Sequence, residues 1–198
     1  MKGSVIVVGF FVLGIICGVM HILPGWVNNP TLSSATLFVL LFAVGMSVGH
    51  DSDFFKQFRQ LDRRYLLLPL MTILGTWMGC FVVAWFLSDL NLSDCLAISS
   101  GFGYYSLSSM IISNAKGPEL GTIALMANII REVITLLGAP LLVRIFGRLA
   151  PISSGGATTM DTTLPIITET CGHQFVMVSL FHGFVVDFSA PFLVPLFL

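Results

Sequence analysis

The chain has 198 residues, of which 56% are hydrophobic and only 10% are charged, and its formal net charge at pH 7 is −1. A soluble globular domain carries roughly 25% charged residues, so this composition excludes an ordinary soluble protein and predicts an integral membrane protein in a lipid bilayer. The sequence has no stripe rich in Lys and Arg, so we expect no nucleic acid as a partner.

Several segments are long and apolar enough to cross a membrane, since a spanning helix needs about 20 mostly apolar residues. The seven candidates are 4–23, 32–49, 65–87, 95–113, 119–143, 157–171 and 174–197. The fourth is rich in Gly and Ser and the sixth is short, so these two are expected to be irregular. We predict an all-α, multi-pass membrane protein with at least one discontinuous helix, and a single transmembrane domain over residues 1–198.

The loop 51–64 is the most basic short loop, with Lys56, Arg59, Arg63 and Arg64. Basic loops stay in the cytoplasm, so we place this loop there. Beyond residue 95 two topologies remain open, because segment 95–113 either spans once or re-enters on the side where it began.

The sequence points away from metal and enzyme chemistry. The four cysteines (Cys17, Cys80, Cys95 and Cys171) are dispersed and form no zinc-binding pattern, so we expect no metal site and no cofactor. No hydrolase motif or P-loop is present. A protease dyad of Asp161 and Asp187 has no second motif to support it, so the chain is predicted not to be an enzyme and no residue is assigned as catalytic.

The segment GGATTMDTTLP, residues 155–165, places a carboxylate, Asp161, between two apolar runs. Gly155 and Gly156 loosen the backbone and Pro165 disfavours a helix before it. Hydroxyl groups that can satisfy the freed peptide groups come from Thr158, Thr159, Thr162 and Thr163. A broken membrane helix is tolerated only inside protein or beside a cavity, so we predict a substrate or ion site here. The alternative is a surface loop.

A second candidate break is GFGYYSLSS, residues 101–109, where glycines and serines interrupt an apolar run. We expect it to face the first break, with Tyr104, Tyr105 and Ser106 lining the site. The alternative is a packing helix of small residues with interfacial tyrosines.

Segment 119–143 carries polar residues at helical spacing: Asn128, Arg131, Glu132 and Thr135 share one face. Polar groups in hydrocarbon are functional candidates. We expect Arg131 to bind a substrate carboxylate; the alternative is that it pairs with Asp161 as structural support.

The last segment contains His182 and Asp187, which are candidates for a proton relay because histidine titrates near neutral pH. The alternative for His182 is a packing residue within the helix bundle.

Together, GFGYYSLSS, the Arg131-Glu132 pair, GGATTMDTTLPII and FHGF around His182 resemble the LysO family of bacterial lysine exporters. The resemblance runs from about residue 32 to the end, and GGATTMDTTLP is its most specific part. It implies export of L-lysine and its toxic analogues, driven by an ion gradient, across a bacterial inner membrane. It also implies kinship with cation-antiporter-like transporters, which contain inverted repeats and crossed broken helices.

The expected function is therefore a secondary transporter for L-lysine coupled to H⁺ or Na⁺. The alternatives are a transporter of another small ion or organic acid, or an accessory membrane subunit that does not transport. Family members are typically longer, and inverted-repeat transporters form their site between two halves. We therefore expect a small membrane companion subunit, or a homo-oligomer, to complete the site.

Overall fold

The computed structural model describes residues 63–87 and 90–198, and before them only residues 13, 16, 17, 19, 20 and 46. The chain divides into two compact units, Met1–Gln60 and Leu61–Leu198. The second unit contains nearly all of the described residues. The expected spans at 4–23 and 32–49 and most of the basic loop 51–64 lie outside the described residues. That the whole chain forms one transport domain stays a prediction.

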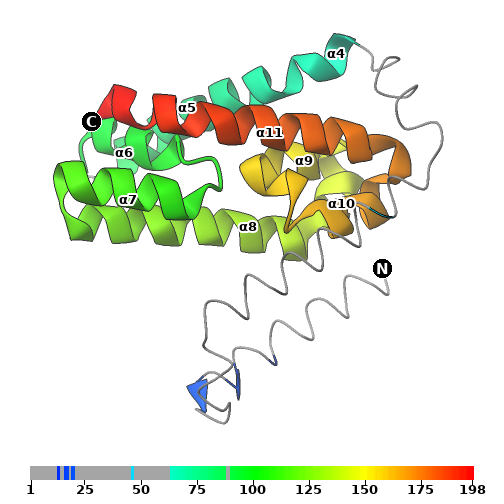
Figure 1. Ribbon diagram of the computed structural model, residues 1–198, viewed down its shortest axis with the longest axis horizontal. Helices are drawn as coiled ribbons and strands as arrows, with labels where there is room; N and C mark the ends of the chain where they lie inside the picture. Colours follow the sequence, from blue (N-terminus) through cyan, green and yellow to red (C-terminus); the bar gives the residue numbers. More distant parts are fainter. Residues whose placement is uncertain (1–12, 14–15, 18, 21–45, 47–62, 88–89) are drawn as a thin grey trace. The chain divides into compact units, whose positions relative to one another are not determined.

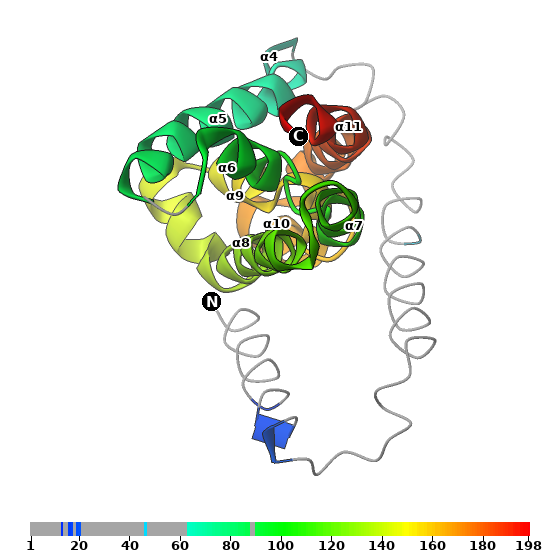
Figure 2. The same ribbon diagram turned by 90° about the vertical axis from the view of Figure 1, so that its left-hand side faces the viewer.

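All regular elements in 63–87 and 90–198 are helices, so the prediction of an all-α protein is confirmed for this part of the chain. The α-helices are α4 (Arg63–Leu66), α5 (Leu68–Phe86), α6 (Leu92–Ser99), α7 (Tyr105–Lys116), α8 (Pro118–Phe146), α9 (Ala150–Gly155), α10 (Leu164–Cys171) and α11 (Val176–Leu193). Short 3₁₀ helices are η2 (Gly156–Met160), η3 (His173–Phe175) and η4 (Pro195–Phe197). Helices α5 and α11 run along one side and α7 and α8 along the other, with α6 and α9 between them (Figures 1 and 2).

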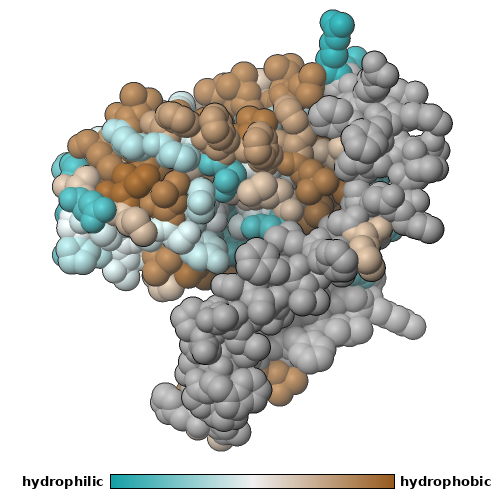
Figure 3. Space-filling view, viewed as in Figure 1, coloured by the Kyte–Doolittle hydropathy of each residue, from teal (hydrophilic) through white to brown (hydrophobic). Residues whose placement is uncertain are grey.

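Within the described ranges, two stretches are long and apolar enough to cross a membrane: Leu68–Phe86, which is α5, and His173–Phe197, which contains α11. Apolar side chains cover the outer surface over these two helices (Figure 3). On α5, Trp85 and Phe86 are 89% and 81% exposed. Large contiguous apolar surfaces of this kind mark contact with a membrane or another protein, and lipid suits a helix whose peptide groups are all bonded internally.

Glycines bound the longest helix, α8. Gly117 precedes it with φ +98° and Gly147 follows it with φ +88°, and both have open space where a Cβ would lie. Pro118 occupies the first turn, where its missing N–H leaves no bond unmade. The chain therefore turns sharply at both ends of α8, which folds α7 and α9 back along it.

The expected irregularity of segment 95–113 is a break in the helix. Helix α6 ends at Ser99 and α7 starts at Tyr105, so residues 100–104 are not helical. Phe102 has φ +46°, which is rare for a residue with a side chain, and Gly103 has φ +99°. The Phe102 side chain is fully buried. The reading of this stretch as a continuous packing helix is therefore wrong.

The second break follows α9. The chain passes through η2 and a turn at residues 161–163 before α10 starts at Leu164, with Pro165 in its first turn. Gly156 has φ +64°, and Thr159, Thr163 and Leu164 are all 0% exposed. The alternative of a surface loop is therefore wrong, because this segment lies in the core.

The two breaks cross in direct contact. The backbone N–H of Ala157 donates to the carbonyl oxygen of Phe102 at 2.8 Å. A Cβ added to Gly156 would collide with that same oxygen, and one added to Gly103 would lie 3.1 Å from the Gly155 oxygen. Helix α11 approaches η2 as closely, since a Cβ on Gly183 would lie 2.7 Å from the Met160 nitrogen. Glycine is needed wherever two backbones meet this closely.

We predict that Gly156→Ala destabilises the protein. The substitution puts a Cβ at positive φ and against the Phe102 oxygen, and the strained backbone alone costs about 1–3 kcal/mol. The midpoint of thermal unfolding of the detergent-solubilised chain should fall by several degrees.

The matched control is Gly75→Ala on α5, where nothing lies within 4 Å of the added Cβ. It should leave the midpoint unchanged or slightly raised, because alanine favours the helix. An unchanged midpoint for Gly156→Ala would show that the backbones do not meet at this point.

Candidate functional site

Helix α8 presents its polar face to both breaks. Asn128 and Thr135 are 3% and 0% exposed, and Arg131 and Glu132 are partly buried between them. The four side chains that the spacing predicted to share a face therefore all turn inward. Asn128 contacts the first break. Arg131 and Thr135 contact α9, which precedes the second break, and Glu132 lies near the turn that follows the second break.

Asn128 satisfies the peptide groups of the first break. Its Oδ1 accepts a hydrogen bond from the Gly103 N–H at 2.7 Å, while its Nδ2 donates to the Ala124 oxygen at 2.8 Å and to Ser108 Oγ at 3.4 Å. Without this side chain the Gly103 N–H would be buried without a partner. A buried donor in that state costs about 1–3 kcal/mol.

Arg131 binds the C-terminal end of α9. Its Nε donates to the Ser154 oxygen at 2.8 Å and its Nη2 to the Ser153 oxygen at 3.0 Å. The last carbonyls of a helix carry partial negative charge, so a cation is favoured there. The guanidinium carbon also lies 5.9 Å from the centre of the Phe102 ring. Arg131 therefore contacts both broken segments.

The alternative that Arg131 pairs with Asp161 is wrong, since these two described residues form no ion pair. Thr135 supports the arrangement from the next turn, with its hydroxyl 2.7 Å from Ser154 Oγ. The sequence indicated a polar partner for Arg131 but not that the partner would be backbone, because carbonyls at a helix end have no residue-type signature.

Three carboxylates gather beside the second break. Glu132 and Asp187 both interact electrostatically with Asp161, and the Tyr105 phenol interacts with Glu132 and Asp161. Asp161 Oδ1 accepts hydrogen bonds from the backbone N–H and the hydroxyl of Thr162. Among the residues that the structure describes, none of these three carboxylates forms an ion pair with a lysine or arginine. We call Glu132, Asp161 and Asp187 the acidic group; carboxylates that interact with one another favour a bound cation.

No metal cluster accompanies the acidic group: within the described ranges, no three His, Cys, Asp or Glu side chains are placed to hold a metal ion.

Two of the four threonines of the second break, Thr158 and Thr159, bond to its backbone carbonyls as the sequence predicted. Thr158 Oγ1 donates to the Gly155 oxygen at 3.0 Å and lies 3.2 Å from Thr163 Oγ1. Thr159 Oγ1 lies 2.8 Å from the Gly156 oxygen and 3.0 Å from the Ser179 oxygen. Thr158, Thr159 and Thr163 are thus committed to the fold, and Thr162 is the one that faces Asp161.

The start of α7 supplies the tyrosines. Tyr105 is 37% exposed and faces the acidic group. Tyr104 packs beside Phe102 and Ala157 at the crossing. Ser106 is exposed, and its carbonyl accepts a hydrogen bond from Ser109. The structure therefore brings Tyr105 to the acidic group, places Tyr104 against the crossing, and leaves Ser106 on the surface of the described unit.

His182 and Asp187 face different surroundings. His182 is fully buried, with Nε2 2.9 Å from Thr72 Oγ1 and Nδ1 3.3 Å from Thr159 Oγ1. Asp187 lies near Asp161 instead. His182 thus connects α5 with η2 through hydroxyl groups, and the structure does not bring it to Asp187.

Sequence reasoning missed two contributors on α5. Thr72 contacts His182 and also donates to Ser153 Oγ at 3.1 Å, and Thr76 accepts from Arg131 Nη1 at 3.5 Å. The two threonines lie four residues apart, so they share one face of an apolar helix. A search for paired hydroxyl residues at helical spacing in the apolar segments would have found them.

We predict that Asn128→Ala destabilises the first break. Removal of the side chain leaves the Gly103 N–H without its acceptor, so the free energy of unfolding should fall by about 1–3 kcal/mol. Thermal unfolding of the purified chain measures this. The control is Asn114→Ala on the exposed face of α7, which should change little; equal losses from the two variants would contradict the assigned contact.

Comparison with known proteins assigns the family. The family model described as "Lysine exporter LysO" matches residues 8–198. The chain is 34% identical over 165 residues to the lysine exporter LysO of Escherichia coli K12; the alignment covers 83% of this chain and 54% of that protein. The chain thus spans about half the length of this relative.

A second relative is similar over nearly its whole length. The chain is 33% identical over 195 residues to a putative lysine exporter of Haemophilus influenzae, and the alignment covers 98% of this chain and 95% of that protein. No solved structure matches the chain. The extent of the family match and these two identities show that the chain belongs to the lysine exporter LysO family.

Proposed function

We propose that this chain is a multi-pass secondary transporter that exports L-lysine and its analogues across the bacterial inner membrane, coupled to H⁺ or Na⁺. The names of its relatives support lysine as the substrate. An exporter family also favours a transporter over an enzyme.

The crossing beside the acidic group is the observation that carries this proposal. Broken helices are tolerated in a membrane where protein or a cavity surrounds them, and transporters place substrate and ion sites at such breaks. Here the two breaks contact each other through Ala157 and Phe102, and three carboxylates without a cationic partner among the described residues lie beside them. Such a site suits both the ammonium groups of the substrate and the coupling cation.

We assign the cation site to Asp161 and Glu132. Asp161 is held by Thr162, and Glu132 and the Tyr105 phenol lie close enough to interact with it. Asp187 approaches from α11. One site that accepts either a substrate ammonium or a coupling cation makes the two compete. Competition for one site is the simplest basis for antiport, because release of one cation allows the other to bind.

The architecture we propose has about seven membrane segments in inverted repeats. The crossing would lie near the interface between the two halves, where such transporters bind their substrates. A small membrane companion subunit or a second copy of the chain would complete the site.

We predict that Asp161→Asn and Glu132→Gln each reduce lysine efflux at least about tenfold, because a charge-assisted contact contributes about 1.5–3 kcal/mol and each 1.4 kcal/mol is a factor of ten. The assay loads cells that lack their own exporter with a lysine-containing dipeptide and measures lysine released. Glu169→Gln, at an exposed position on α10, is the matched control and should export normally. Normal efflux from well-expressed Asp161→Asn would refute the assigned site.

We also predict that the active protein is an assembly. Purified from its native membrane in mild detergent, the chain should migrate with a companion protein or with a second copy. Recovery of a lone monomer that exports lysine in liposomes would refute this part of the proposal and leave the cation site in place.

A further inference from the structure

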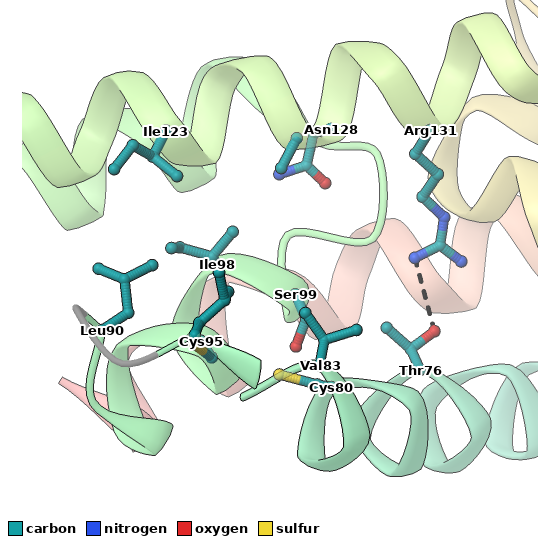
Figure 4. A pocket seen from close by; sticks show the side chains of 12 residues that line it. Thr76, Cys80, Val83, Leu90, Cys95, Ile98, Ser99, Ile123, Asn128 and Arg131 are labelled. Atoms are coloured by element: carbon teal, nitrogen blue, oxygen red, sulfur yellow. Dashed lines mark hydrogen bonds between the residues drawn. The ribbon is translucent and has the colours of Figure 1, made fainter. Parts of the chain in front are cut away.

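A cavity of about 340 Å³ lies between α5, α6 and α8, on the side of Arg131 that faces α5 (Figure 4). Its size is within the range of roughly 300–1,000 Å³ that holds small molecules. Arg131 and Thr76 lie at one end, and Leu90 and Ile123 lie at the other (Figure 4). The wall between them is mainly aliphatic and thiol side chains, with Asn128 beside it.

Arg131 is the one charged side chain among the described residues that line the cavity. Two of its guanidinium nitrogens donate to the end of α9, at 2.8 and 3.0 Å. The third, Nη1, has one hydrogen-bond partner within the described part of the chain, Thr76 Oγ1 at 3.5 Å, which is the outer limit of a hydrogen bond. Nη1 therefore has donor capacity to offer a ligand in the cavity, and an anion complements it in charge.

The positive charge of Arg131 and the negative charge of Glu132 lie on different faces of α8. Arg131 and Glu132 are consecutive, so their side chains leave the helix about 100° apart. Arg131 faces α9 and Thr76, whereas Glu132 faces Thr162 and Asp161. The helix thus presents a cation to the cavity and an anion to the acidic group.

We infer that this cavity is the subsite for the carboxyl end of an amino-acid substrate. The carboxylate binds Arg131 Nη1 and Thr76, and the aliphatic wall packs against the methylene groups. A carboxylate oxygen accepts a charge-assisted hydrogen bond from a guanidinium N–H such as Nη1, which is stronger than a bond between neutral groups. This subsite rests on the proposed function, which makes an amino acid the substrate; the acidic group lies on another face of α8 and does not line the cavity. It explains how an exporter distinguishes an amino acid from a diamine.

The test uses a thiol placed in the cavity. Ala127 lines it and is exposed on α8, whereas its neighbour Met126 is also exposed but is not part of the lining. Ala127→Cys and Met126→Cys are prepared in the full chain, in lipid nanodiscs. The rate of alkylation by N-ethylmaleimide is read at each position by peptide mass spectrometry. The probes are lysine, 6-aminohexanoate, which lacks the α-amino group, and 1,5-diaminopentane, which lacks the carboxyl group.

Lysine and 6-aminohexanoate should slow alkylation of Ala127→Cys several-fold, and 1,5-diaminopentane should not. The rate at Met126→Cys should be unaffected by all three. Adding Thr76→Val should raise the concentration of 6-aminohexanoate needed for protection about tenfold, the effect of losing one hydrogen bond to a charged group.

Three outcomes would overturn the inference: no alkylation at residue 127, equal protection by the diamine, or no protection by either carboxylate while phosphatidylglycerol in the nanodisc protects. The last outcome would assign the cavity to lipid. Protection by 6-aminohexanoate but not by lysine would support a carboxylate subsite and reject lysine as the substrate, so the two proposals fail separately.

Discussion

The hydrogen bond from the Ala157 N–H to the Phe102 oxygen is the contact on which the described unit depends. A helix that stops inside a membrane leaves peptide groups without partners, and each one costs several kcal/mol in hydrocarbon. This protein stops two helices at the same place, so that some of the freed groups satisfy each other. Side chains satisfy others: Asn128 accepts from Gly103, Arg131 donates to the end of α9, and threonine hydroxyls cover η2.

The same arrangement determines where Arg131 and the acidic group are placed. The end of α9 is a negative dipole end, and Arg131 neutralises it. With that arginine bonded to the backbone, no cation among the described residues pairs with the acidic group. On one face of α8 Arg131 is thus bonded to backbone carbonyls, and on another face Glu132 has no cationic partner within the described part of the chain. A fold that used Arg131 to neutralise Asp161 would stabilise the carboxylate at the cost of its affinity for a mobile cation.

The breaks were predictable because local chemistry produces them. Glycines, serines, threonines and Pro165 mark residues 101–109 and 155–165 in the sequence, and both stretches are interrupted in the structure. The partner of Arg131 was not predictable, since backbone carbonyls leave no trace in composition. The same limit applies to His182: its two hydroxyl neighbours come from α5 and η2, and their approach depends on how three elements pack, which spacing along one helix does not encode. Of the five expected spans that fall within the described residues, two, at Leu68–Phe86 and His173–Phe197, meet the criteria of length and apolar composition.

Arg131 has a consequence for movement, because it contacts the end of α9 and the ring of Phe102 at once. One side chain thus connects the two breaks. Gly117 and Gly147, at the two ends of α8, have open space where a Cβ would lie. The backbone is therefore freer at the ends of α8 than at its middle, where Asn128, Arg131 and Thr135 form hydrogen bonds.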